Sequence, residues 1–250
     1  MTWAGRRQLF IIGGIAFVLI AVLFPVVKPV VAPAPTCFDN KQNQDEKGID
    51  CSGPCQKICP SEPSLVKVLW VRPFKVADCV YNAVAYVTNP NAEFAILNAP
   101  YTLKLFDDKN ILVTERKGYI DIAPKVTMPI FEGGIVTSKA NVSQAFFDLG
   151  DDLNWQREAG VKKKISVGAP VLENGATPKV SATVQNTTLE ILRKVPFVVV
   201  VFDEKGNAQA ASETTVDSLG KNETAEIVFT WQLPFEKAVG PIEIYPLTAD

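Results

Sequence analysis

The chain has 250 residues, a formal net charge of −2 and no histidine. Near-balanced charge gives no sign of a nucleic-acid partner, because proteins that bind nucleic acids carry basic patches. The lack of histidine removes the commonest general base, the Ser-His-Asp and Cys-His arrangements and every zinc site that contains histidine. No spacing of lysines or carboxylates indicates a catalytic site in their place, so we expect a protein that is not an enzyme.

Residues 9–27 form an apolar run of 19 residues without a charged or strongly polar side chain. As a helix, this run would be just long enough to cross the hydrocarbon core of a bilayer. Arg6 and Arg7 precede it, and Lys28 is the charge that follows most closely. The positive-inside rule then predicts a cytoplasmic tail at residues 1–8, a single transmembrane helix, and a C-terminal body outside the cytoplasm.

Two alternatives to a membrane anchor stay open. A cleaved signal peptide would end at small residues, and the Ala-Pro-Ala sequence at residues 32–34 matches this loosely. A lipoprotein would need a small residue before its first cysteine, whereas Thr36 precedes Cys37. All three interpretations export the rest of the chain. Prolines recur through residues 28–36, which predicts an extended stalk between the bilayer and the body.

Residues 37–60 hold four of the five cysteines, Cys37, Cys51, Cys55 and Cys59. The segment has almost no apolar side chains, so a covalent or ionic link must hold it. Outside the cytoplasm the cysteines should oxidise to disulfides, and the sequence does not choose among their three pairings. A zinc site with four cysteine ligands is the alternative, because Cys51, Cys55 and Cys59 are spaced four residues apart.

The same segment resembles a short module of bacterial surface proteins with the pattern C-x-D-G-x-x-N-x-x-E-x-G-x-D-C-G-G-x-C. It departs from this pattern at Asn40 and Ser52, where the module has glycine. The resemblance implies a calcium-stabilised, disulfide-closed turn. Hard oxygen ligands suit calcium, and the candidate ligands are the side chains of Asp39, Asn43, Glu46 and Asp50. An acidic loop that is merely solvated is the alternative.

The fifth cysteine, Cys79, lies at the expected start of a strand in the sequence VADCVYNAVAYV. We expect it to be a small buried apolar side chain. A bond to the cysteine-rich module or to another chain is the alternative.

From residue 65 the chain is expected to form strands, and it repeats with a period near 97 residues. The segment NAVAYVTNPN aligns with KVSATVQNTT, which pairs Asn89 with Asn186. The segment YTLKLFDDKNILV aligns with FVVVVFDEKGNAQ, which pairs Phe106 with Phe202. Apolar and polar side chains alternate in several of these segments, as in half-buried strands. A period of this length indicates one small sandwich per copy.

The order of strand, asparagine, loop, strand and F-D-x-K-x-N resembles the FxLYD and LEA14-like group of exported bacterial sandwich domains. The whole chain also resembles membrane proteins of candidate-phylum bacteria. The resemblance implies an immunoglobulin-like, seven-stranded fold without catalytic activity. We therefore expect a mainly β protein with two tandem immunoglobulin-like β-sandwiches, at residues 65–156 and 163–250.

These observations predict a single-pass protein of the cell membrane whose extracytoplasmic body is a binding or scaffold protein. Its partner would be an envelope protein or a surface ligand. A structural subunit of a cell-envelope, secretion or pilus assembly is the alternative. The first hypothesis predicts a monomeric body, whereas the second predicts oligomers that form through an edge strand.

Overall fold

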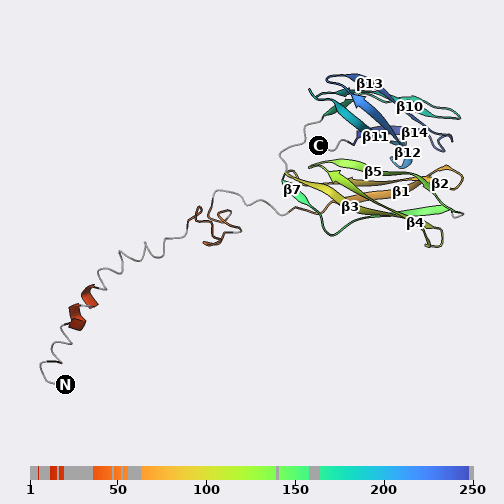
Figure 1. Cartoon of the computed structure of the whole chain (residues 1–250). Helices are drawn as coiled ribbons and strands as arrows, with labels where there is room; N and C mark the ends of the chain where they lie inside the picture. The colour runs from red at the N-terminus through yellow and green to blue at the C-terminus, as the bar shows by residue number, and fades with distance from the viewer. Residues whose placement is uncertain are drawn as a thin grey trace. The chain divides into compact units, whose positions relative to one another are not determined.

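Figure 1 shows a computed structural model of the chain, which describes residues 5, 12–15, 17–19, 36–46, 48–51, 53–55, 63–138, 141–157 and 164–247. The chain divides into two compact units, Met1–Glu62 and Pro63–Asp250. The first unit contains the predicted membrane segment and the cysteine-rich module. The second unit contains every strand that the structure describes.

The structure describes only part of the predicted transmembrane segment at residues 9–27. Residues 12–15 and 17–19 are helical, and the rest of the segment lies outside the described residues. Within the described residues, no helix is both long and apolar enough to cross a membrane. The predicted tail and stalk lie outside the described part of the chain, except for Gly5 and Thr36.

The first half of the second unit is a β-sandwich of two antiparallel sheets. Its strands are β1 (Lys67–Ala77), β2 (Val80–Thr88), β3 (Phe94–Asp107), β4 (Leu112–Ile122), β5 (Thr127–Val136), β6 (Val142–Leu149) and β7 (Trp155–Arg157). One sheet has the order β1-β2-β5. The other has the order β4-β3-β6, and β7 pairs with the first residues of β3.

The second half repeats this arrangement. Its strands are β8 (Ile165–Val167), β9 (Val171–Glu173), β10 (Lys179–Asn186), β11 (Leu192–Asp203), β12 (Ala208–Leu219), β13 (Thr224–Thr230) and β14 (Val239–Pro246). One sheet has the order β13-β10-β8, with β9 also paired to β10, and the other has the order β12-β11-β14. With β8 and β9 in the place of β1, the pairings β1-β2-β5 and β4-β3-β6 are repeated, whereas no described strand of the second half corresponds to β7. The predicted mainly β architecture is confirmed.

Alternating side chains form the core of each sandwich. Tyr81, Ala83, Ala85 and Val87 of β2 face the first core together with residues of β3 and β5. Val180, Ala182 and Val184 of β10 face the second core, as their spacing predicts. Burying one face of a strand in this way fixes its register, because a shift by one residue would turn the apolar side chains to solvent.

A buried asparagine closes the same end of each sandwich. Asn89 is 1 % exposed and Asn186 is 0 % exposed. The Nδ2 atom of Asn89 donates to the carbonyl oxygens of Phe94 at 2.7 Å and Ala123 at 3.0 Å. Asn186 makes the two corresponding bonds at 2.7 and 2.9 Å, to residues 96 and 97 positions further along the chain. Each amide therefore ties the end of β2 or β10 to the chain at or just before the next strand, and to the turn after the strand that follows.

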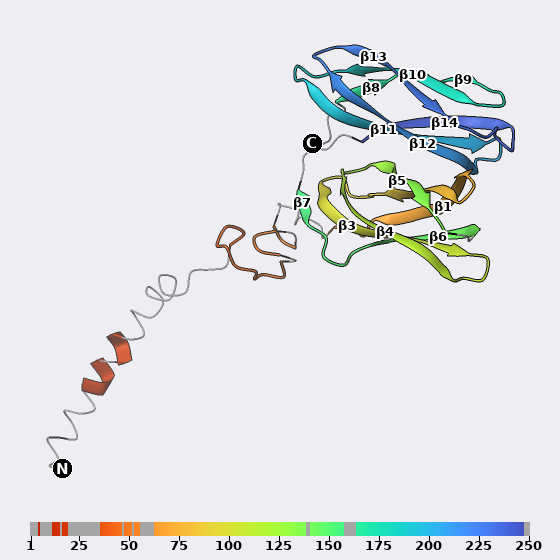
Figure 2. The same ribbon diagram turned by 45° about the vertical axis from the view of Figure 1, so that its right-hand side comes forward.

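The two sandwiches pack face to face through the sheets β1-β2-β5 and β12-β11-β14. Their facing side chains form a third apolar cluster that includes Phe74 and Val84 from the first sandwich and Val198, Val200 and Phe202 from the second. The result is four sheets in successive layers, which Figure 2 shows most clearly. Residues 197–202 of β11 are buried on both faces, which explains the uninterrupted apolar run FVVVVF in this part of the strand.

Hydrogen bonds fix how the two facing sheets lie on each other. Arg72 donates to the carbonyl oxygen of Ala208 at 3.1 Å, and Asn82 donates to that of Ala211 at 3.2 Å. The hydroxyl group of Tyr86 donates to Oε2 of Glu243 at 2.7 Å. Because buried donors and acceptors are costly when unpaired, these bonds favour one registration of the sheets over others.

Candidate functional site

The cysteine-rich module contains a disulfide between Cys37 and Cys55. Cys51 is also disulfide-bonded, and Cys59 lies outside the described residues. The prediction that the module is closed by disulfides is confirmed for these three cysteines. Because the sulfur atoms are oxidised, Cys37, Cys51 and Cys55 cannot serve as thiolate ligands, and the alternative of a four-cysteine zinc site is wrong.

The side chains predicted to bind calcium are engaged with the module's own backbone. Asp50 accepts hydrogen bonds from the backbone N–H groups of Asp39 at 3.0 Å and Asn40 at 2.9 Å. Oε2 of Glu46 accepts from the N–H groups of Asn43 and Asp50, both at 3.2 Å. Asn43 donates to Oδ2 of Asp39 at 2.9 Å, and this bond lowers the pKa of the Asp39 carboxyl group. The carboxylates hold the loop in place of an apolar core.

The module also has a tight turn that explains one of its glycines. Gly53 has a φ of +62°, and a Cβ atom there would collide with the carbonyl oxygen of Asp45. This is the position at which the resembled pattern also has glycine, and only glycine adopts this backbone at so close an approach without strain.

These contacts give limited support to a calcium site. In the described part of the chain, one cluster of three cysteine or carboxylate side chains has its ligand atoms within 4.8 Å of one another, namely Cys37, Glu46 and Cys55. Two of the three are joined in the disulfide, and Asp39 and Asp50 are not in the cluster. One observation favours a ligand, since Oδ1 of Asn43 is buried without a hydrogen-bond partner. Calcium binding stays a prediction.

The prediction for Cys79 is wrong. This cysteine is exposed and unbonded, and it lies in the two-residue turn between β1 and β2 with a φ of 60°. Its carbonyl oxygen accepts a hydrogen bond from the backbone N–H of Thr137 at 2.8 Å. The side chain is turned to solvent because the chain reverses direction one residue before the strand begins.

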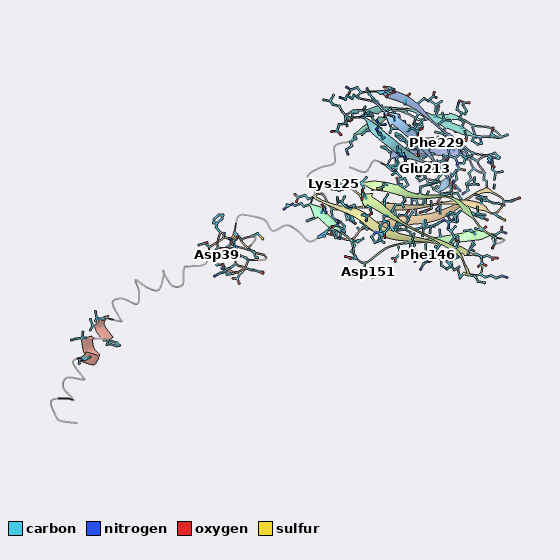
Figure 3. All side chains as sticks on the ribbon, viewed as in Figure 1. Asp39, Lys125, Phe146, Asp151, Glu213 and Phe229 are labelled. Carbon is cyan, nitrogen blue, oxygen red and sulfur yellow. A yellow bond between two sulfur atoms is a disulfide. The ribbon has the colours of Figure 1, made fainter. Side chains whose placement is uncertain are left out.

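The outer face of the sheet β4-β3-β6, which we call the free face, is a second candidate site. Phe106 and Phe146 meet edge to face there, with ring centroids 5.5 Å apart, and Phe146 is 60 % exposed. Figure 3 shows Phe146 on the side of the first sandwich that is turned away from the second. The rings line a hollow of about 630 Å³ together with Lys104, Gln144 and Asp148.

Sequence reasoning missed the free face as a site, although a signal was present. Phe106 follows Thr102 and Lys104 on the polar side of β3. A large aromatic side chain at a solvent position of an alternating strand is the kind of exposed apolar feature that marks interaction sites. The side chains around Phe106 and Phe146 are polar and charged, so the two rings form a small apolar patch.

Comparisons with known proteins leave the family of this chain open. No family model matches it, and no curated protein matches it. Among solved structures, red sea bream transglutaminase is similar at 9 % sequence identity and a TM-score of 0.24. The similar region covers 72 % of this chain and 29 % of the transglutaminase chain. This likeness carries no argument about activity, and the resemblance to the FxLYD and LEA14-like group stays a prediction.

Proposed function

We propose that the chain is a membrane-anchored, extracytoplasmic binding or scaffold protein without catalytic activity, and that its free face contacts the partner. The observation that carries this proposal is the pair of the partly exposed Phe106 and the exposed Phe146 in a hollow on the sheet β4-β3-β6. Contiguous exposed apolar side chains with a polar rim are typical of protein interaction sites.

The N-terminal segment supports the anchoring part of the proposal. Residues 9–27 are apolar throughout. Among the helical residues of this run that the structure describes, Ile12 is 63 % and Phe17 is 74 % exposed. Apolar side chains exposed around a helix suit a lipid environment, because burial in hydrocarbon removes them from water. The disulfide between Cys37 and Cys55 supports an oxidising location outside the cytoplasm.

The sheet order supports an immunoglobulin-like assignment. In that fold the first, second and fifth long strands share one sheet, and the third and sixth share the other. The pairings β1-β2-β5 and β3-β6 agree with this scheme. Two pairings depart from it. β4 pairs with β3, whereas the fourth strand of this scheme shares a sheet with the first, second and fifth. β7 also pairs with β3, whereas the last strand of an immunoglobulin sandwich pairs with the sixth.

Self-assembly, as expected of a structural subunit, has less support. The outer face of the sheet β13-β10-β8 carries polar side chains at Ser181, Thr183, Gln185 and Glu226. The equivalent outer face of the first sandwich is apolar and covered by the second sandwich. A polar exposed face gives a neighbouring copy little apolar area to bury, so further stacking would gain little free energy.

Photo-cross-linking in native membranes tests this proposal. A photoreactive residue in place of Gln144 on the free face should capture one dominant protein. The same residue in place of Thr183, on the outer face of the second sandwich, should not. The substitution Phe146→Asp should abolish the cross-link, whereas the matched control Val171→Asp, at a site that is 59 % exposed, should leave it unchanged. A cross-link insensitive to Phe146→Asp would contradict the proposal, and self-links alone would favour the structural subunit.

Calcium binding by the module is tested separately on the full chain. If calcium binds, millimolar Ca²⁺ should slow hydrogen exchange of the backbone amides of residues 39–50, because ligand binding stabilises the folded form. The variant Asn43→Ala, which lacks the unpaired oxygen, should lose this protection. Unchanged exchange in the presence of Ca²⁺ would remove the calcium prediction.

A further inference from the structure

A cleft of about 910 Å³ lies where the two sandwiches part at one end of their shared interface. The first sandwich lines it with the end of β4, the turn after β4 and the start of β5. The second sandwich lines it with β8 and the end of β14. Its volume is within the range of small-molecule sites, roughly 300 to 1,000 Å³, and such sites are frequent between domains.

The deeper walls of the cleft are apolar. Ile120 and Met128 come from the first sandwich, and Val167, Ile244 and Leu247 come from the second. Met128 is buried, whereas the other four are partly exposed at the edges of their cores. These side chains would lose more contact with water if an apolar group occupied the cleft, and the gain is about 25 cal/mol for each Å² buried.

The charged side chains of the cleft leave it positive. Lys125 and Lys164 contribute ammonium groups, and Asp121 contributes a carboxylate. Oδ1 of Asp121 accepts a hydrogen bond from the backbone N–H of Asn98 at 2.6 Å, so this acid is already engaged. Lys125 is exposed, and no described residue forms an ion pair with it. Figure 3 shows Lys125 at the end of the first sandwich.

Two tyrosine hydroxyl groups near the cleft, those of Tyr86 and Tyr245, stay uncharged. Tyr245 lines the cleft, and its hydroxyl group hydrogen-bonds to Tyr86 and to Glu243. Burial raises the pKa of Tyr86 to about 12, and burial together with Glu243 raises the pKa of Tyr245. Both hydroxyl groups therefore remain protonated at neutral pH, and they add no negative charge to the cleft wall.

We propose that this cleft binds an anionic amphiphile, with the apolar chain against Ile120, Val167 and Leu247 and the anionic group at Lys125. The ligand could be a soluble molecule, such as a fatty acid, or a single lipid taken from the bilayer. The inference does not depend on the partner of the free face, because the two sites share no lining residue.

Titration of the purified full chain with dodecyl phosphate, below the critical micelle concentration of this ligand, tests the proposal. We expect saturable binding of one molecule per chain, measured by isothermal titration calorimetry and native mass spectrometry. The variant Ser166→Trp, at an exposed position of the cleft wall, should fill the cleft and weaken binding at least about ten-fold. Lys125→Glu should weaken it by a similar factor, because it replaces attraction with repulsion.

Matched controls separate the cleft from the rest of the surface. Lys205→Glu makes the same charge change in the exposed turn between β11 and β12, outside both linings, and should leave binding unchanged. Dodecanol, which has the same chain without the charge, should bind at least about ten-fold more weakly than dodecyl phosphate. Transfer of a fluorescent phosphatidylglycerol from vesicles would identify a bilayer lipid as the source, and binding without transfer would identify a soluble amphiphile. Absent saturation, or affinity unaffected by Ser166→Trp, would overturn the proposal.

Discussion

Strands β3 and β11 occupy the same place in two copies of one arrangement, yet their outer faces have different surroundings. On the inner face, Leu103 and Leu105 of β3 are fully buried, as are Phe197 and Val199 of β11. On the outer face, Lys104 is exposed to solvent, whereas its counterpart 96 residues later, Val200, is 0 % exposed. The second sandwich uses this face to pack on the first.

This difference shows that the spacing of apolar residues along a strand indicates both the core of its own sandwich and whether another sheet packs on its outer face. Alternation in β3 indicates a sheet with one face in water, and the continuous run VVVV in β11 indicates a sheet covered on both faces. The inner positions are apolar in both strands because both sandwiches need a core. The outer positions differ because only one of the two sheets has another sheet against it.

Exchanging the outer residues of β3 and β11 tests this difference, and it should have the largest effect on the free energy of unfolding. Val200→Lys places an ammonium group between two packed sheets. Glu243 lies opposite it on β14, but its carboxylate already accepts hydrogen bonds from Tyr86 and Tyr245. We expect a loss of about 3 kcal/mol or more in the free energy of unfolding, measured by urea denaturation. Proteolysis of the segment that joins the sandwiches should also become faster.

The reciprocal variant Lys104→Val is the matched control. It removes a charge from the free face, and we expect a change within about ±0.5 kcal/mol in the free energy of unfolding. Comparable losses from both variants would mean that the outer faces of β3 and β11 are equally buried, which would contradict the four-layer arrangement.

Much of the fold could be predicted because it rests on local periodicity and on internal repetition. The alignment of Asn89 with Asn186 found the residues that close both sandwiches, since a buried amide with several partners leaves little choice of residue. The stacking of the sandwiches was not predicted. It depends on contacts between distant strands, and only the apolar run of β11 pointed to a second covered face.

Asn89 and Asn186 test the opposite case, a feature that both sandwiches share. Asn89→Ala and Asn186→Ala each leave buried carbonyl oxygens without a donor. We expect each variant to lose about 1 to 3 kcal/mol of unfolding free energy, by similar amounts in the two sandwiches. Asn141→Ala, at an exposed position, should change it by less than about 0.5 kcal/mol. A loss confined to one copy would show that the two ends are not equivalent.

The candidate sites were less predictable for two physical reasons. A count of acidic residues indicates that Asp39, Glu46 and Asp50 could bind calcium, but it does not tell where their lone pairs point. In the structure these lone pairs accept backbone N–H groups. Cys79 was misplaced because its turn contains Asp and Cys rather than the glycine or asparagine that usually marks a hairpin.

The turns after β3 and β11 offer a smaller test of the same comparison. Asp203 accepts hydrogen bonds from the N–H of Asn207 at 2.7 Å and from Nζ of Lys237 at 3.2 Å, and these partners lower the pKa of its carboxyl group. Asp107 accepts the corresponding backbone bond from Ile111 at 2.8 Å, and no described cation pairs with it.

A carboxyl group whose pKa is lower in the folded chain adds stability above its unfolded pKa, and this stability is lost as the pH falls through the folded pKa. Asp203→Asn should therefore lower the melting temperature at pH 7, more than Asp107→Asn does. The deficit of Asp203→Asn should shrink as the pH falls below the ordinary aspartate pKa of about 3.9. Thermal denaturation across pH 2 to 7 measures this, and a deficit that persists at low pH would assign the effect to packing instead.

The smallest expected effect concerns Glu213, whose counterpart in the first sandwich is Lys117 on the outer side of β4. Figure 3 shows Glu213 between the two sandwiches. Desolvation raises the pKa of the Glu213 carboxyl group, and the Glu132 carboxylate raises it further. A group with a raised pKa gives its full contribution below the unfolded pKa, and that contribution is lost as the pH rises through the folded pKa.

Replacing this carboxylate should therefore stabilise the chain at neutral pH. We expect Glu213→Gln to increase the unfolding free energy at pH 7 by less than about 1 kcal/mol, because the site is partly solvated and charge interactions there are screened. The gain should vanish below about pH 4, where the carboxyl group is protonated in both states. Lys117→Gln should be close to neutral at both pH values. An equal gain from Glu213→Gln at pH 4 and pH 7 would mean that packing, rather than repulsion from Glu132, limits the stability of this part of the interface.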